Sequence, residues 1–308
     1  MRPDSAALRC IDDVLVFSYD YSKYIHLVWS TTPAASDYAS WIVEVIDSIS
    51  GKLVMKAPNL IRRDYDNRGA FQFNQDSTKV LVLRNAIFDW TSGTLIQEIP
   101  PKVTYPRGIV NRKLTGFFAL RAKFGSNKNL VYYDINSGKE LWSIAPGHYE
   151  GQFTDIAPND STIALIINKT LKIADMNASK IIDIQVADPV HAIFSRDGQS
   201  LFVSSLVASS IWSSIDGKCM YVNQDSYSIT ASIDNSILFI LGKDNVIRIY
   251  DAGTMQQISE IQSELLTKPF GGGWREDELR SYTKLMISAD GKKLAIHRME
   301  KAELWTVA

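Results

Sequence analysis

The feature that most constrains this chain is a sequence phrase that returns about every 40 residues. It is a short apolar run that ends in aspartate and passes into a turn with serine and glycine, as in Val45–Gly51, Ile87–Gly93 and Tyr132–Gly138. Five of these aspartates are Asp47, Asp89, Asp134, Asp175 and Asp251. They are separated by 42, 45, 41 and 76 residues, and the last interval covers two units. A fixed period of this kind indicates repeated supersecondary units.

Each unit opens with a second phrase, which is a strand-like run followed by a turn of the type Ser-x-Asp-Gly. Phe194–Gly198 and Ile287–Gly291 are the clearest copies, and Phe73–Ser77 and Ala231–Asn235 are looser ones. Short apolar runs bounded by Gly, Asp, Asn and Ser indicate β-strands, and helical spacing is hard to find anywhere in the chain. Four such strands in each period of about 40 residues are typical of the blade of a β-propeller.

We therefore predict an all-β fold, a seven-bladed β-propeller of four-stranded antiparallel blades that forms a single domain over residues 1–308. Length is no obstacle, because a repeat ring of this size can form one unit. The predicted blades cover about 14–57, 70–99, 108–144, 152–186, 190–223, 226–261, and 282–308 completed by 5–10.

The last unit explains why the N-terminus enters this prediction. Lys284–Ala308 contains three strand patterns where the earlier units contain four. A sheet that stopped there would leave an unpaired edge of N–H and C=O groups. We expect residues 5–10 to pair beside Glu303–Val307, which would close the ring.

These phrases resemble the WD40 and WD40-like β-propeller family across essentially the whole chain. The resemblance depends on the Ser-x-Asp-Gly turns and on the unit endings Ile247–Asp251, Ile87–Trp90 and Glu303–Thr306. Only Gly147–His148 matches the Gly-His dipeptide of that family, so no blade is assigned its Asp-His-Ser/Thr-Trp tetrad. The phrase Asp134–Trp142 also looks like the repeats of quinoprotein-type propellers.

Composition limits the functional class and the expected location. The net charge of −1 gives no overall preference for nucleic acid or anionic membranes, and no run of 18 apolar residues predicts a spanning helix. The N-terminus lacks the apolar core of a secretory signal. Cys10 and Cys219 form no disulfide framework, and we expect each to be a small core residue. A cytoplasmic location is expected, with the nucleus as an alternative.

The longest departures from the repeat are the expected sites of function, since blades mainly serve packing. Strand order places the second-to-third strand loops and the blade-to-blade loops on one face of the predicted disc. The segments that form this face are 30–40, 58–69, 100–108, 121–129 and 262–281.

The loops of the first three units are rich in basic residues. These are Arg62, Arg63, Arg68, Lys102, Arg107, Arg121, Lys123 and Lys128. Arginine offers forked donors for carboxylate or phosphate, so we predict a site for an acidic partner segment. The alternative is a solvated rim without a specific partner. Nucleic acid would make at most a local contact here.

The last long loop contains Phe270 and three glycines followed by Trp274 and Arg275. We predict a mobile arm that presents the two aromatic residues as anchors for a partner, because aromatic side chains dominate interface hot spots. The alternative is a loop that folds back and buries Trp274. It lacks the context of a phosphate-binding loop.

No residue pattern specifies catalysis, a cofactor or a metal. His26, His148, His191 and His297 lack metal-binding spacing, the acids Glu276–Glu278 are typical of a solvated run, and no Gly-x-Ser-x-Gly elbow occurs. We therefore predict a non-catalytic scaffold that binds other proteins. The alternative is a lactonase-like or quinoprotein-like propeller with a ligand site at its central channel.

Overall fold

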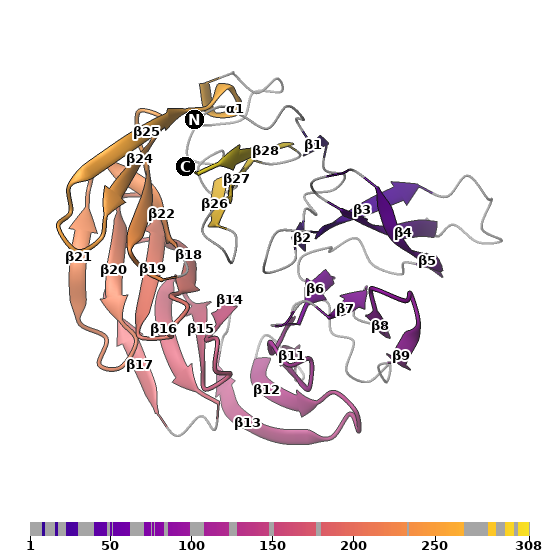
Figure 1. Ribbon diagram of the computed structural model, residues 1–308. Helices are drawn as coiled ribbons and strands as arrows, with labels where there is room; N and C mark the ends of the chain where they lie inside the picture. The colour runs from indigo at the N-terminus through magenta and orange to yellow at the C-terminus, as the bar shows by residue number, and fades with distance from the viewer. Residues whose placement is uncertain are drawn as a thin grey trace. The chain divides into compact units, whose positions relative to one another are not determined.

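The structure is a computed structural model, and almost all of its ordered elements are β-strands (Figure 1). It describes residues 8–9, 16–17, 23–29, 40–47, 50, 52–61, 71–74, 76, 78–82, 86–98, 108–122, 128–147, 151–176, 180–232, 234–267, 283–287, 293–298 and 301–307. Among these residues the single α-helix is α1 (Glu264–Thr267). No helix in this part of the chain is both long enough and apolar enough to cross a membrane.

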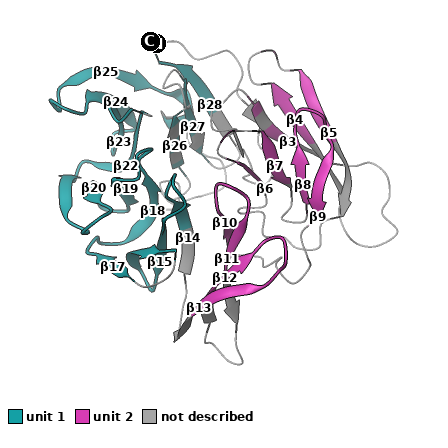
Figure 2. Ribbon diagram, turned by 60° about the horizontal axis from the view of Figure 1, so that its bottom comes forward, with its two compact units in different colours: residues 1–9, 149–308 teal, residues 10–148 magenta. Residues whose placement is uncertain are grey.

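The chain divides into two compact units, residues 10–148 and residues 1–9 with 149–308 (Figure 2). The unit formed by residues 10–148 contains three antiparallel sheets of four strands, each in chain order. They are β2 (Val16–Phe17), β3 (Lys23–Trp29), β4 (Ser40–Asp47), β5 (Leu53–Ile61); β6 (Phe71–Phe73), β7 (Lys79–Val82), β8 (Ala86–Asp89), β9 (Leu95–Glu98); and β10 (Gly108–Val110), β11 (Gly116–Ala122), β12 (Lys128–Asp134), β13 (Glu140–Gly147).

The other unit contains four sheets, of which three again follow chain order. They are β14 (Gly151–Ile156), β15 (Thr162–Ile167), β16 (Thr170–Asp175), β17 (Ile181–Ile184); β18 (Pro189–Phe194), β19 (Ser200–Ser205), β20 (Ser209–Ser213), β21 (Cys219–Asn223); and β22 (Ser226–Ala231), β23 (Ile237–Gly242), β24 (Val246–Asp251), β25 (Gln257–Gln262). The fourth sheet has the order β1 (Leu8–Arg9), β28 (Lys301–Thr306), β27 (Lys293–Arg298), β26 (Thr283–Ile287).

The all-β prediction and the four-stranded unit are therefore confirmed. In five sheets every strand has at least three residues, whereas the sheets that contain β1 and β2 each include a strand of two. Two predicted bounds are wrong. Strand β5 continues to Ile61, with Pro58 at an irregularity of the ladder on an edge strand, where proline is tolerated. The segment 121–129 is not all loop, because β11 continues to Ala122 and β12 begins at Lys128.

The recurring aspartate caps the turn between the third and fourth strands of a sheet. In the turn after β12, the N–H and hydroxyl of Ser137 both donate to Asp134 Oδ1, at 2.8 and 2.7 Å. Asp89 accepts the same two bonds from Ser92, and Asp251 accepts them from Thr254. These donors hold the pKa of each carboxyl below its ordinary value. The repeat seen in the sequence is thus a repeat of one hydrogen-bonded turn.

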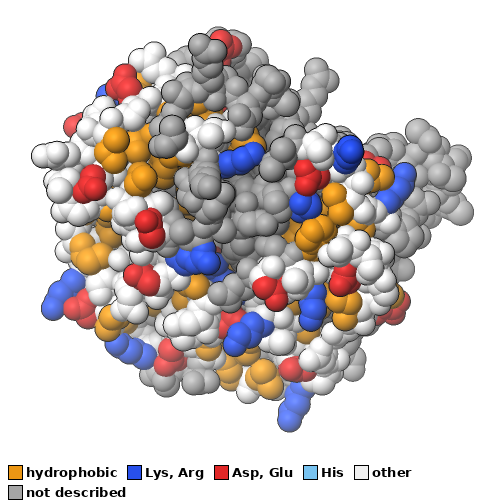
Figure 3. Space-filling model, viewed as in Figure 1, with side chains coloured by type: hydrophobic (Ala, Val, Ile, Leu, Met, Phe, Trp, Pro, Cys, Tyr) orange, Lys and Arg blue, Asp and Glu red, His pale blue; other side chains and the backbone are white. Residues whose placement is uncertain are grey.

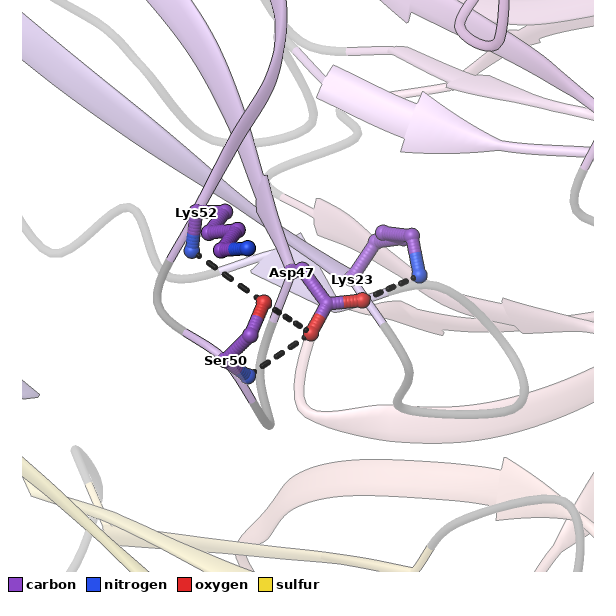
Figure 4. A network of polar contacts seen from close by, with 4 residues as sticks. All are labelled: Lys23, Asp47, Ser50 and Lys52. Carbon is purple, nitrogen blue, oxygen red and sulfur yellow. Dashed lines mark hydrogen bonds and ion pairs between the residues drawn. The ribbon is translucent and has the colours of Figure 1, made fainter.

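The first copy of this turn, whose polar contacts Figure 4 shows, also takes part in a contact with the next sheet. Ser50 donates to Asp47 Oδ1, and Lys23 Nζ donates to Asp47 Oδ2 at 2.8 Å. Lys23 comes first among the groups that hold the pKa of Asp47 well below its ordinary value. The same ammonium lies 5.3 Å from the centre of the Trp90 ring, in the turn after β8. This cation–π contact ties the first sheet to the second.

The Ser-x-Asp-Gly phrase forms the turn between the first and second strands. After β18, the Ser195 hydroxyl donates to Asp197, accepts the N–H of Ser200, and thereby closes the loop. Ser232 and Asp234 repeat this arrangement after β22. The looser copy Phe73–Ser77 uses Asn74, whose side-chain amide donates to Asp76 and accepts the N–H of Lys79.

Apolar contacts between neighbouring sheets form the core. In strand β19, Leu201 packs into the cluster shared with the preceding sheet, while Phe202 packs against the following sheet. Leu238 and Phe239 of β23 divide in the same way between two interfaces. Successive side chains of a strand point to opposite faces, so a sheet covered on both sides needs an unbroken apolar strand. This explains the runs Leu-Phe-Val in β19 and Leu-Phe-Ile-Leu in β23.

Two glycines of equal conformation differ in their surroundings, and this difference predicts unequal costs of substitution. Gly198 and Gly217 both have φ of +71°, but a Cβ on Gly217 would lie 2.5 Å from Ile182 Cγ2 of the neighbouring sheet, and one on Gly198 would lie 3.7 Å from its nearest atom. We expect Gly198→Ala to lower the free energy of unfolding by about 1–2 kcal/mol, and Gly217→Ala to lower it further. Urea denaturation of both variants measures the difference, and equal losses would contradict close sheet packing at Gly217.

The N-terminal strand pairs with the last strand of the chain, as the sequence analysis predicted. The register differs from the prediction, because Leu8 faces Ala302 and Arg9 faces Lys301, rather than residues of Glu303–Val307.

We expect deletion of residues 1–10 to lower the melting temperature, since it exposes the edge of β28. Deletion of residues 1–4 is the control and should leave the melting temperature near that of the full chain. An unchanged melting temperature for the longer deletion would show that this pairing contributes no stability.

Candidate functional site

The two ends of each sheet differ in character. The hairpins between the first and second strands and between the third and fourth strands lie at one end, which we call the turn end. The second-to-third strand connections and the connections to the next sheet lie at the other, which we call the loop end. At the turn end the two hairpins are bonded together, as where Ser214 N–H donates to Gln199 O and Ala252 N–H donates to Ser236 O, at 2.9 and 2.8 Å. The turn end is therefore uniform, and variation in length is concentrated at the loop end.

A small pocket opens at the loop end of the unit formed by residues 1–9 and 149–308. Its lining comes from strands β18, β19, β22 and β26, so three sheets contribute to it. The polar residues that line it are His191, Ser204, Ser205, Tyr227, Ser228 and Thr283. The space accommodates about one water molecule.

Serine hydroxyls connect the sheets around this pocket. Ser204 Oγ lies 3.5 Å from Ser228 Oγ, across the boundary between two sheets. Nearby, the buried hydroxyls of Ser209 and Ser226 hydrogen-bond each other, and Ser226 also donates to the carbonyl of Asn223. A 3.5 Å contact is at the outer limit of hydrogen bonding, so Ser204 and Ser228 retain capacity for a further polar partner.

Helix α1 is fixed at the loop end by one carboxylate. Glu303 Oε2 accepts from Ser263 Oγ at 2.6 Å and from Trp305 Nε1 at 3.1 Å, and its Oε1 accepts from the Leu265 N–H at 3.0 Å. The N–H groups of a first helical turn have no partners inside the helix, and Glu303 and Ser263 together satisfy that of Leu265.

Arg298 holds the other end of the same helix. Its side chain is buried, with the residue 5% exposed, and Nη1 donates to the carbonyls of Leu265 and Leu266 at 3.3 and 2.5 Å. Carbonyls at a helix end attract a cation. Strands β27 and β28 thus fix where the chain leaves β25. Sequence reasoning missed this pair, because the partners lie 32 to 40 residues away and no local motif marks them.

Most of the residues predicted to bind a partner lie outside the described residues. This applies to Arg62, Arg63, Arg68, Lys102, Arg107, Lys123, Phe270, Trp274 and Arg275. The backbones of Arg121 and Lys128 belong to β11 and β12, next to each other at the loop end of their sheet. The structure therefore brings these two together and leaves the rest of the predicted surface untested.

Two remaining expectations concern cysteine and histidine. Cys219 does lie in a fourth strand, β21, but it is exposed rather than in the core. The expectation that Cys219 is buried is therefore wrong. A fourth strand has a neighbouring strand on one side only. His191, for which no metal-binding role was expected, is one of the residues that line the pocket. Within the described ranges, no group of three His, Cys, Asp or Glu is placed to hold a metal ion.

No protein-family model matches the chain. A search of curated proteins finds no match either.

The Glu303 carboxylate is expected to be the main support of the loop-end helix. We predict that Glu303→Ala lowers the free energy of unfolding by about 2–3 kcal/mol, because three donors lose a charged acceptor. Glu303→Gln keeps an acceptor and should cost less. Glu260→Ala, an exposed acid on β25, is the matched control and should change stability by less than about 0.5 kcal/mol. Urea denaturation measures the free energy of unfolding of all three variants. An unchanged value for Glu303→Ala would show that Glu303 does not support the helix.

Proposed function

We propose that this protein is a seven-bladed, WD40-like β-propeller that acts as a non-catalytic scaffold for other proteins. The observation that carries the proposal is the contrast between the two ends of its sheets. The turn end repeats one hydrogen-bonded arrangement, whereas the loop end carries connections of very different length. Insertions on a repeated scaffold are where binding surfaces evolve most freely.

The propeller arrangement is supported by how the sheets pack within each unit. From β14 to β28, each sheet packs against the next in chain order through apolar clusters. The sheet β6–β9 packs against β10–β13 in the same way. Radial repetition of four-stranded sheets leaves only short edges, which is the advantage of a propeller. The β1–β28 pairing is the closure that such a ring would use.

The proposed binding surface is the loop end, formed by the segments 30–40, 58–69, 100–108, 121–129 and 262–281. Its basic residues suit an acidic segment of a partner protein, through forked Arg contacts with carboxylates. The aromatic residues Phe270 and Trp274, with Arg275, would add anchors to the same surface. Nucleic acid would be a local contact within a larger assembly, and the cytoplasm is the proposed setting.

The second candidate is a ligand site at the centre of the propeller, and the hydroxyl-lined pocket is the observation in its favour. First strands of three sheets contribute to this pocket. Its room for about one water molecule favours the scaffold role over binding of an organic ligand.

The experiment compares two triple charge reversals that change the net charge equally. Arg62, Arg63 and Arg107 are replaced by Glu in one variant, and the exposed turn-end residues Lys52, Lys113 and Lys139 in the other. Binding of a fluorescent Asp/Glu-rich peptide is measured by anisotropy at low salt. We expect the loop-end variant to bind at least about tenfold more weakly, a loss of about 1.4 kcal/mol, and the turn-end variant to bind nearly as the parent does.

Equal weakening in both variants would show that only overall charge matters. Undiminished binding by the loop-end variant would overturn the acidic-partner site. Circular dichroism spectra of both variants should match that of the parent, so that loss of folding is recognised.

A further inference from the structure

The outer edges of the sheets carry most of the exposed large apolar side chains. Large apolar residues at least 45% exposed occur on six fourth strands: Leu53, Leu95, Ile96, Leu141, Ile181, Met220, Val222 and Ile258. A fourth strand has a strand partner on one side only, so its other side offers unpaired N–H and C=O groups. Natural proteins usually protect such edges with charged residues, proline or bulges.

Strand β21 has less of this protection than the other fourth strands that the structure describes. Its residues, Cys-Met-Tyr-Val-Asn, include no charged residue and no proline. The other fourth strands that follow chain order each contain a charged residue: Lys56 in β5, Glu98 in β9, Glu140 in β13, Asp183 in β17 and Glu260 in β25. A bulge at Met220 is its one protective feature, and β5, β9, β13 and β25 have bulges too.

Hydrogen-bond alternation shows which backbone groups of β21 face outward. Ser205 N–H donates to Ala208 O where β19 meets β20, and Ser213 N–H donates to Lys218 O where β20 meets β21. Bonded and non-bonded pairs alternate along an antiparallel ladder, so Ile211 and Ser209 bond toward Tyr221 and Asn223. The pair Ser210–Val222 is then a non-bonded pair. The N–H and C=O of Val222 therefore point away from the sheet.

The preceding sheet approaches the turn before this strand. Lys180 Nζ donates to the Ile215 carbonyl at 2.9 Å, which places the start of β17 next to the turn before β21. Ile215 in this turn is 60% exposed, and Met220 and Val222 in β21 are 54% and 49% exposed. Hydrophobic atoms reach the surface at the left margin of Figure 3, where Figure 1 places β21. We call Cys219–Asn223 with Ile215 the β21 edge.

We propose that the β21 edge is a second interaction surface, which accepts an extended, uncharged segment of a partner protein as an added β-strand. Main-chain hydrogen bonds to Val222 would supply affinity, and alternate apolar side chains would cover Met220 and Val222. The composition of the strand selects this partner, because β21 itself carries no charged residue and, of the charges that flank it, Asp216 and Lys218 pair with each other at 3.0 Å. This surface uses none of the segments assigned to the loop-end binding surface, and it goes beyond the function proposed above.

The test uses a pool of fluorescent heptapeptides that alternate Val, Ile or Phe with Thr and carry no charge. A matched pool has N-methyl groups on alternate amides, which removes strand donors and keeps the side chains. We expect anisotropy to show binding of the first pool to the full chain, and at least about tenfold weaker binding of the methylated pool, a difference of about 1.4 kcal/mol.

Two variants locate the binding. Val222→Lys places a charge on the β21 edge, and Ile258→Lys makes the same change at a residue of similar exposure on β25. We expect the first to weaken binding about tenfold or more, and the second to leave it within about twofold. Val222→Pro removes the outward N–H on an edge strand where proline is tolerated, and should act like Val222→Lys.

Three results would overturn the proposal. These are no binding of the unmethylated pool, equal binding of both pools, or equal effects of Val222→Lys and Ile258→Lys. Light scattering of the full chain adds a fourth. A concentration-dependent dimer that Val222→Lys abolishes would show that a second copy of this chain, and not a partner segment, occupies the edge.

Discussion

The structure depends on apolar contact between neighbouring sheets, and this requirement falls most heavily on the inner strands. A sheet between two others must be apolar on both faces, which is why Leu201 and Phe202, adjacent in β19, serve different interfaces. Outer strands are free of this demand and vary in exposure, as β21 and β25 show. Whether the side chains of a strand belong to the core or to the surface therefore depends on the position of that strand within its sheet.

Turn chemistry solves a second problem, which is how to reverse the chain many times without leaving unpaired polar groups. Asp134 and Ser137 satisfy each other and the backbone within five residues. Because this solution is local, it leaves a local sequence signature. The periodicity of the turns, their strand boundaries and the all-β class could consequently be predicted from the sequence within a few residues.

What the sequence could not predict depends on contacts between distant residues. Glu303 and Arg298 fix helix α1 from strands that follow it by more than 30 residues, and no spacing rule connects them. The four-residue helix itself lies in a segment where only a loop was expected. Cys219 was misplaced for a related reason, since burial of a fourth strand depends on what lies beyond the sheet. The predicted partner site at Arg62 and Trp274 remains a prediction.

The pairing of β1 with β28 has a consequence for how the chain folds. Leu8 and Ala302 are neighbours in one sheet, although nearly the whole sequence separates them. Contacts of such long range are slow to form, because the intervening chain loses much conformational entropy when its ends meet. The sheets built from consecutive strands can form earlier. During that interval β28 would expose an unpaired edge, and the folding intermediate would be most prone to aggregation at that strand.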